Sequence, residues 1–194
     1  MADTGWVSPG TVTTAEGDGT QAWSDSENIK TTDESYAVAT LGQQWIRDRT
    51  LKLIDSASGY VGDNQGGNVD WGLNWDTTTY GGGDDMWGNS FSASDVNSSS
   101  FGIAFQVWGQ SGSFVWSDPE DGAVISHYLE ATNFSFNIPV GSTIDGVEAR
   151  IIRRRRADML SFAEAQVDSI EVKVHYTTPP TVGVGYPLPP FAST

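Results

Sequence analysis

The chain has 194 residues, no cysteine, and a formal net charge of −15 that arises from 10 basic and 25 acidic residues. This length buries a large core without disulfide bonds, and the acidic charge disfavours nucleic acid and anionic membranes as partners because both are negatively charged. The 22 Gly and 8 Trp residues favour short strands and tight turns over helices. We therefore expect one all-β domain, an antiparallel β-sandwich with long Gly/Trp/Asp-rich loops and extended termini.

Alternation of apolar and polar residues predicts the strands. In chain order they are residues 35–41, 49–54, 101–107, 113–116, 134–138, 147–152 and 170–176. In the clearest of them, one face is apolar and the other polar, which is typical of antiparallel sheets. Residues 159–166 are expected to form either one or two helical turns or a hairpin connection. The turn 139–142 should precede a strand in which Asp145-Gly146 supplies a bulge or a positive φ.

Both ends of the chain differ from this pattern and define three regions. Residues 1–30 are expected to form an extended N-terminal segment, either outside the sandwich or part of it, and residues 31–177 form the sandwich. Residues 178–194 contain five prolines, which cannot continue a hydrogen-bonded ladder. This Pro-rich arm is interpreted either as a disordered end or as an arm that lies on a neighbouring subunit. Its apolar side chains would make that contact: Val182, Val184, Tyr186, Leu188 and Phe191.

A cluster of arginines is the strongest local charge feature. Half of the basic residues lie within seven positions. They are Arg150, Arg153, Arg154, Arg155 and Arg156. Guanidinium groups bind carboxylates through paired hydrogen bonds, so we expect a subunit contact here. The alternatives are a solvated strand end and a contact with nucleic acid.

No catalytic motif stands out, and the chain is expected not to be an enzyme and to need no metal or cofactor. His127 and His175 are isolated and make neither a zinc site nor a triad by themselves. The acidic clusters are interpreted as solvated loop carboxylates, with calcium binding or a glycosidase-like carboxylate pair as alternatives. They are Asp84, Asp85, Asp118, Glu120 and Asp121.

Three tryptophans crowd the long loop over residues 59–83 and its vicinity: Trp71, Trp75 and Trp87. One interpretation is that they anchor this loop to the core, because a long loop needs apolar contacts to hold one conformation. The alternative is an exposed platform that stacks against sugars, as in a carbohydrate-binding module or a receptor-binding fibre.

Three segments together resemble a group of phage virion proteins. The first is residues 128–153, with an apolar strand, the turn Ile138-Pro139-x-Gly141, and Ile144-x-Gly146-Val147 leading to arginine. The second is residues 80–103, which contain Tyr80-Gly-Gly-Gly-Asp and Met86-Trp-Gly, and the third is residues 167–176. In the family, the Ile-Pro segment usually precedes the Trp-Gly segment, whereas here it follows, so the strand order is not carried over.

This resemblance implies a jelly-roll-like sandwich in a phage particle and brings no catalytic residues with it. We expect a capsid decoration protein, assembled in the host cytoplasm, whose partners are a major capsid or tail protein. A homo-oligomer is expected, with a trimer favoured. The N-terminus carries no visible secretory signal, and no stretch approaches 18 apolar residues, so no membrane span is expected. The alternatives are a carbohydrate-binding or receptor-binding tail component and the subunit of a filament.

Overall fold

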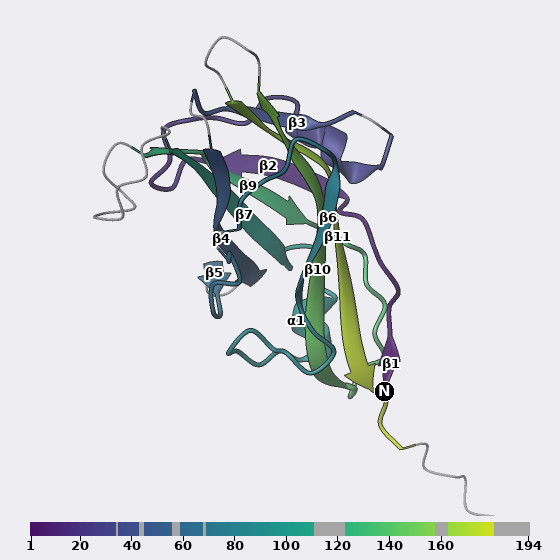
Figure 1. Cartoon of the computed structure of the whole chain (residues 1–194). Coiled ribbons are helices and arrows are strands. Elements are labelled where there is room, and N and C mark those ends of the chain that lie inside the picture. The colour runs from purple at the N-terminus through teal and green to yellow at the C-terminus, as the bar shows by residue number, and fades with distance from the viewer. Residues whose placement is uncertain are drawn as a thin grey trace, which may run out of the picture.

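Two antiparallel sheets pack face to face around one core in the computed structural model, which describes residues 1–33, 35–42, 45–55, 59–67, 69–110, 123–157 and 163–180 (Figure 1). Sheet A has the strand order β1-β11-β10-β6, and β3 also pairs with β11. Sheet B has the order β2-β9-β7-β4-β5, and β8 also pairs with β7. The predicted all-β sandwich is therefore confirmed. The elements are β1 (Ala2–Asp3), β2 (Thr11–Ala15), η1 (Ser26–Lys30), β3 (Ala37–Thr40), β4 (Trp45–Asp55), β5 (Gly59–Val61), β6 (Asp76–Gly81), α1 (Ala93–Val96), β7 (Gly102–Gln110), β8 (Val124–Ile125), β9 (Tyr128–Thr132), β10 (Thr143–Ala157) and β11 (Ala163–Thr177).

The β10–β11 hairpin is the longest feature of the sandwich, with 15 residues in each strand. Val147, Ala149 and Ile151 are fully buried, as the alternation predicts, because they face sheet B across the core. The register shifts between Ile144 and Gly146, which is the predicted bulge. Only glycine fits there, since a Cβ on Gly146 would lie 2.3 Å from the Gly82 carbonyl oxygen.

The N-terminal segment contributes to both sheets. Strand β1 pairs with β11, whereas β2 pairs with β9 in sheet B. Between β2 and η1 the chain crosses the outer face of sheet B, where Asp18 accepts hydrogen bonds from Gln106 Nε2 at 2.9 Å and from Arg49 Nη1 at 2.9 Å. Trp23 then donates its indole N–H to the His127 carbonyl at 2.8 Å. These contacts fasten residues 16–23 to the sandwich.

Removing the Asp18 carboxylate should weaken this attachment at neutral pH but not in acid. Burial raises the pKa of Asp18, but the hydrogen bonds from Gln106 and Arg49 outweigh it and hold the pKa below its ordinary value of 3.8. A lowered carboxyl pKa stabilises the fold above the unfolded-state value, and this contribution disappears as the pH falls through the folded-state value. We expect the free energy of unfolding of Asp18→Ala to lie below that of the unmodified chain at neutral pH and to approach it below pH 3.8. Urea titrations at several pH values measure this, and a gap that persists in acid would contradict it.

Three sequence expectations differ from the structure. Residues 134–138 bury Phe134, Phe136 and Ile138 as predicted but form no strand, because Asn133 and Ser135 adopt left-handed φ angles of 58° and 54°. In β7 both faces are buried rather than one, since the N-terminal crossing covers Gln106. Residues 163–166 belong to β11, so this part of 159–166 is a strand and not a helix.

The predicted strand 113–116 lies outside the described residues, so the structure does not test it. Among the helices that the structure describes, none has the length and apolar character needed to cross a membrane.

Candidate functional site: the arginine strand β10 and the surface at its end

The arginines of β10 point in opposite directions because side chains alternate along a strand. Val147, Ala149 and Ile151 face the core, and Arg153 continues this inward row. Arg150 and Arg154 lie on the other, outer face of sheet A. The arginine cluster of the sequence is thus divided between the interior and the surface.

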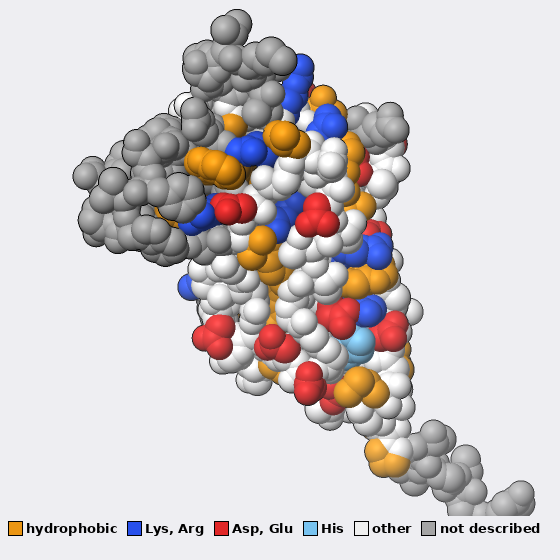
Figure 2. Space-filling model, viewed as in Figure 1, with side chains coloured by type: hydrophobic (Ala, Val, Ile, Leu, Met, Phe, Trp, Pro, Cys, Tyr) orange, Lys and Arg blue, Asp and Glu red, His pale blue; other side chains and the backbone are white. Residues whose placement is uncertain are grey.

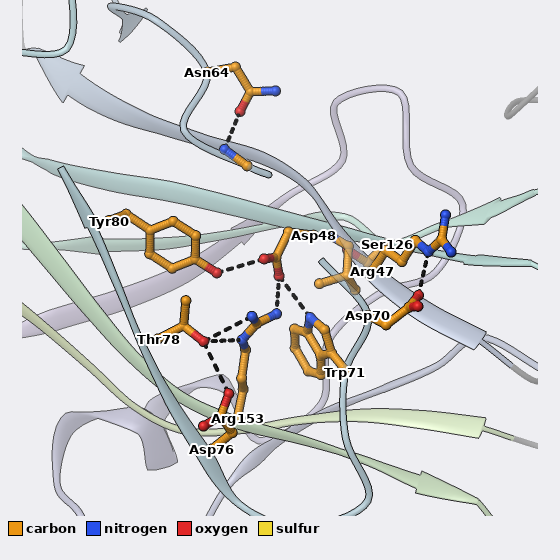
Figure 3. A network of polar contacts seen from close by, with 12 residues as sticks. Arg47, Asp48, Asn64, Asp70, Trp71, Asp76, Thr78, Tyr80, Ser126 and Arg153 are labelled. Atoms are coloured by element: carbon orange, nitrogen blue, oxygen red, sulfur yellow. Dashed lines mark hydrogen bonds and ion pairs between the residues drawn. The ribbon is translucent and has the colours of Figure 1, made fainter. Parts of the chain in front are cut away.

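Arg153 lies between the two sheets in an ion pair with Asp48 of β4 (Figure 3). Both side chains are almost completely buried, at 3 % and 0 % exposed. Asp48 also accepts hydrogen bonds from the Trp71 indole at 2.7 Å and from the Tyr80 hydroxyl at 2.6 Å. Arg153 Nη2 donates to Thr78 Oγ1 at 3.0 Å, and its guanidinium lies 4.9 Å from the centre of the Trp71 ring.

This buried network is a structural element and not a catalytic one. Burial raises the pKa of the Asp48 carboxyl above its usual range, and the Arg153 guanidinium opposes that shift. Burial likewise raises the pKa of the Tyr80 hydroxyl. Perturbed pKa values often mark active sites, but a carboxylate with no exposed surface offers a substrate no access. The prediction that Arg153 contacts a subunit is therefore wrong, because Asp48 and the two sheets enclose its side chain.

Arg150 is held on the outer face of sheet A by its own neighbours. Its Nε donates to Glu171 Oε2 at 2.8 Å, and Trp6 covers it with a ring centre 4.4 Å from the guanidinium. Lys173 lies on the same Trp6 ring at 4.6 Å and pairs with Glu148 at 2.6 Å. Each of these two cations has a carboxylate partner, Glu171 for Arg150 and Glu148 for Lys173. The contact of Arg150 with the Trp6 ring holds the N-terminal segment on sheet A.

The far end of β10 carries a different surface. Arg154 lies 4.3 Å from the Trp75 ring centre and 5.6 Å from that of Tyr36, and the two rings are 5.7 Å apart. Arg155, on the opposite face of β10 from Arg154, lies 4.9 Å from the ring centre of Trp45 in β4, and Trp45 is 37 % exposed. The segment between Trp71 and Trp75 joins these two clusters.

Leu73, in that segment, is 59 % exposed. The residue before it, Gly72, accepts a hydrogen bond at 2.8 Å from the backbone N–H of Arg155. Figure 2 shows Lys and Arg side chains among hydrophobic ones over this upper part of the molecule. We name this region the arginine–aromatic surface and define it as Tyr36, Trp45, Leu73, Trp75, Arg154 and Arg155.

Two of the three loop tryptophans lie in the core, as the loop-anchoring interpretation expects, and not on a sugar-stacking platform. Trp87 is 0 % and Trp71 3 % exposed, and both belong to the core. Trp75 is half-buried beneath Arg154 and Tyr36. The alternative that these tryptophans bind sugar is wrong for Trp71 and Trp87, since burial removes the ring faces that a sugar needs.

Other predicted residues lie elsewhere or outside the description. Arg156 is 53 % exposed and lies 3.9 Å from Glu164. His175 lies 3.4 Å from Glu148, and the described residues contain no group of three His, Cys, Asp or Glu side chains that could hold a metal ion. Asp118, Glu120 and Asp121 fall outside the described part of the chain. So do the apolar residues of the Pro-rich arm, which are Val182, Val184, Tyr186, Leu188 and Phe191.

Sequence reasoning missed four residues, Tyr36, Trp45, Asp48 and Leu73, and the signal for Asp48 was present. Asp48 follows Ile46 in the inward phase of β4, just as Arg153 follows Ile151 in β10, so two opposite charges occupy core positions of facing strands. Trp45 and Tyr36 stand at strand ends, where alternation does not show which side chains will meet.

No family model, curated protein or solved structure matches this chain.

Proposed function

We propose that the chain is a structural protein of a bacteriophage particle, a capsid decoration protein that acts through contacts with other subunits. The arginine–aromatic surface supports the part of this proposal that concerns subunit contacts. It combines exposed Trp45 and Leu73 with arginines held on aromatic rings. Trp, Tyr and Arg are the residues that dominate the energetics of protein–protein interfaces.

The geometry of this surface suits a rigid contact. Stacking on Trp75 and Tyr36 fixes the Arg154 guanidinium, so less side-chain freedom is lost when a partner binds. Arg154 also donates its Nε to Gln166 Oε1 at 2.8 Å. The proposed partner is a major capsid or tail protein with carboxylates opposite these arginines.

The assignment to a phage particle comes from the sequence resemblance over residues 80–103, 128–153 and 167–176. A two-sheet sandwich with a large buried core is a suitable building block for such a role. The same resemblance supports a homo-oligomer, for which a trimer is proposed, and no enzymatic activity.

A charge on the surface tests the proposal. Leu73→Asp should reduce incorporation of the chain into purified particles about fivefold or more, which corresponds to a loss of about 1 kcal/mol of binding free energy. The control is Val140→Asp, because Val140 is 93 % exposed in the turn before β10, at the opposite end of that strand from the arginine–aromatic surface. Quantitative mass spectrometry of gradient-purified particles measures both. Equal incorporation of Leu73→Asp and the unmodified chain would reject this surface as the contact.

A further inference from the structure

Strand β6 leaves one edge of sheet A open. Its six residues pair with β10 from Asp76 opposite Arg153 to Gly81 opposite Glu148, with no register shift. In the described part of the chain, no backbone hydrogen bond joins the other side of β6 to any segment. Thr77 and Thr79 are exposed there. An unpaired edge of this length presents N–H and C=O groups to a further strand.

Other strand edges are shorter or covered. Helix η1 lies against β2, and Ser24 pairs with Val38 on the outer side of β3. Strands β1 and β5 have two and three residues. The usual devices that prevent edge pairing are charged side chains, proline and bulges. Of these, the β6 sequence Asp-Thr-Thr-Thr-Tyr-Gly contains only the charge of Asp76, at its first position.

The C-terminal sequence contains one stretch suited to that edge. Residues 181–186, which lie outside the described part of the chain, read Thr-Val-Gly-Val-Gly-Tyr between Pro180 and Pro187. The stretch has six residues, as β6 has, and carries no charge. Val182, Val184 and Tyr186 alternate with glycine, which is the period of a strand. Proline at both ends limits pairing to these residues.

The tail of the same molecule is too short to cover this edge. Thr177 pairs with Thr143, and three strand spacings, roughly 14 Å, separate β11 from a strand added beyond β6. Gly81 lies opposite Glu148 and hence Lys173, roughly 13 Å further along the hairpin. The separation is therefore roughly 19 Å, whereas the four residues from Thr177 to Thr181 reach at most roughly 14 Å.

We propose that residues 181–186 of one molecule add as a strand to the free edge of β6 in a second copy of this chain. Thr78 and Tyr80 face the interior, where they bond Arg153 and Asp48, so the apolar residues of the added strand lie beside them on the inner face. Gly183 and Gly185 then lie on the outer face beside Thr77 and Thr79. The contact joins different surfaces of two copies and builds a ring or an open chain. This inference rests on the subunit contacts of the proposed function and names the partner of the arm.

The absence of cysteine from the chain permits a clean cross-linking test. A Thr79→Cys chain is mixed with a Gly183→Cys or Gly185→Cys chain under mild oxidation. At least one mixture should give a disulfide-linked pair several-fold faster than Thr79→Cys mixed with Val184→Cys, whose thiol would point to the opposite face. Equal rates in all mixtures, or no cross-linking, would overturn the inference. So would a doubly substituted T79C/G183C chain that cross-links only within itself.

A second variant tests the edge without touching the tail. Thr77→Lys with Thr79→Lys should shift self-association, followed by sedimentation velocity, to at least about tenfold higher concentration. The control is Thr14→Lys, because Thr14 is an exposed threonine of β2 in the other sheet, where the added strand is not proposed to pair. Unchanged association of the double-lysine variant would contradict the inference. If these tests fail while the chain is still found in particles, strand addition alone is lost; if they succeed and particles lack the chain, the virion proposal is lost.

Discussion

The Arg153→Met variant is expected to unfold with a free energy about 3–5 kcal/mol below that of the unmodified chain, the usual cost of removing one partner of a buried ion pair. Asp48 is 0 % exposed and would keep only Trp71 and Tyr80 as donors. Without the guanidinium, burial raises the pKa of Asp48 further. A carboxyl pKa raised above its unfolded value destabilises the fold as the pH rises through that interval. The loss should therefore be larger at pH about 8 than at pH about 5, as measured by urea unfolding.

Two further variants separate this ion pair from general disruption. Asp48→Leu combined with Arg153→Met should recover part of the loss, because no buried charge remains, although Tyr80 and Trp71 lack an acceptor. Arg156→Met, at an exposed position of the same strand, should change stability by less than about 0.5 kcal/mol. Similar losses for Arg153→Met and Arg156→Met would mean that the buried pair is not what stabilises the two sheets.

Replacing Trp87 by alanine is expected to lower the free energy of unfolding by about 3–5 kcal/mol, since the change leaves a large cavity in the core. Trp87 is fully buried, and its indole N–H donates to the Val147 carbonyl of β10 at 2.9 Å. Its backbone N–H donates to Asp85 at 2.7 Å, and its carbonyl accepts from Asp63 at 2.6 Å. Trp87 therefore fixes the loop after β6 to sheet A.

Trp45→Ala provides the comparison within the same chain. Trp45 is 37 % exposed, so its removal should cost about 1 kcal/mol, chiefly the contact of its ring with Arg155. Differential scanning calorimetry of the two variants distinguishes these values. A small loss for Trp87→Ala would instead favour an accessible ring and would revive the sugar-stacking alternative.

Local periodicity predicted much of the sandwich. The inward row Val147, Ala149 and Ile151 and the bulge at Gly146 follow from the sequence, because alternation and glycine each act within a few residues. The same alternation, continued for two positions, places Arg153 in the core. A charged residue at an inward-facing position of a strand indicates a buried partner of opposite charge. The structure shows that this partner is Asp48.

Other features depend on contacts between distant segments. Arg155 lies against the Trp45 ring and donates its backbone N–H to the Gly72 carbonyl, and no local pattern encodes the approach of these distant segments. Trp71 and Trp87 were ambiguous for a similar reason, since a loop tryptophan looks the same whether its ring enters the core or faces solvent. The left-handed angle at Ser135 ended a predicted strand although the apolar alternation continued.

Electron cryomicroscopy of purified phage particles tests most directly whether the chain acts by contacting neighbouring subunits. The account predicts density for the two-sheet sandwich on the particle, with Trp45, Leu73, Trp75 and Arg154 buried against another protein. Particles that lack this density, or that carry the sandwich with these side chains facing solvent, would contradict it.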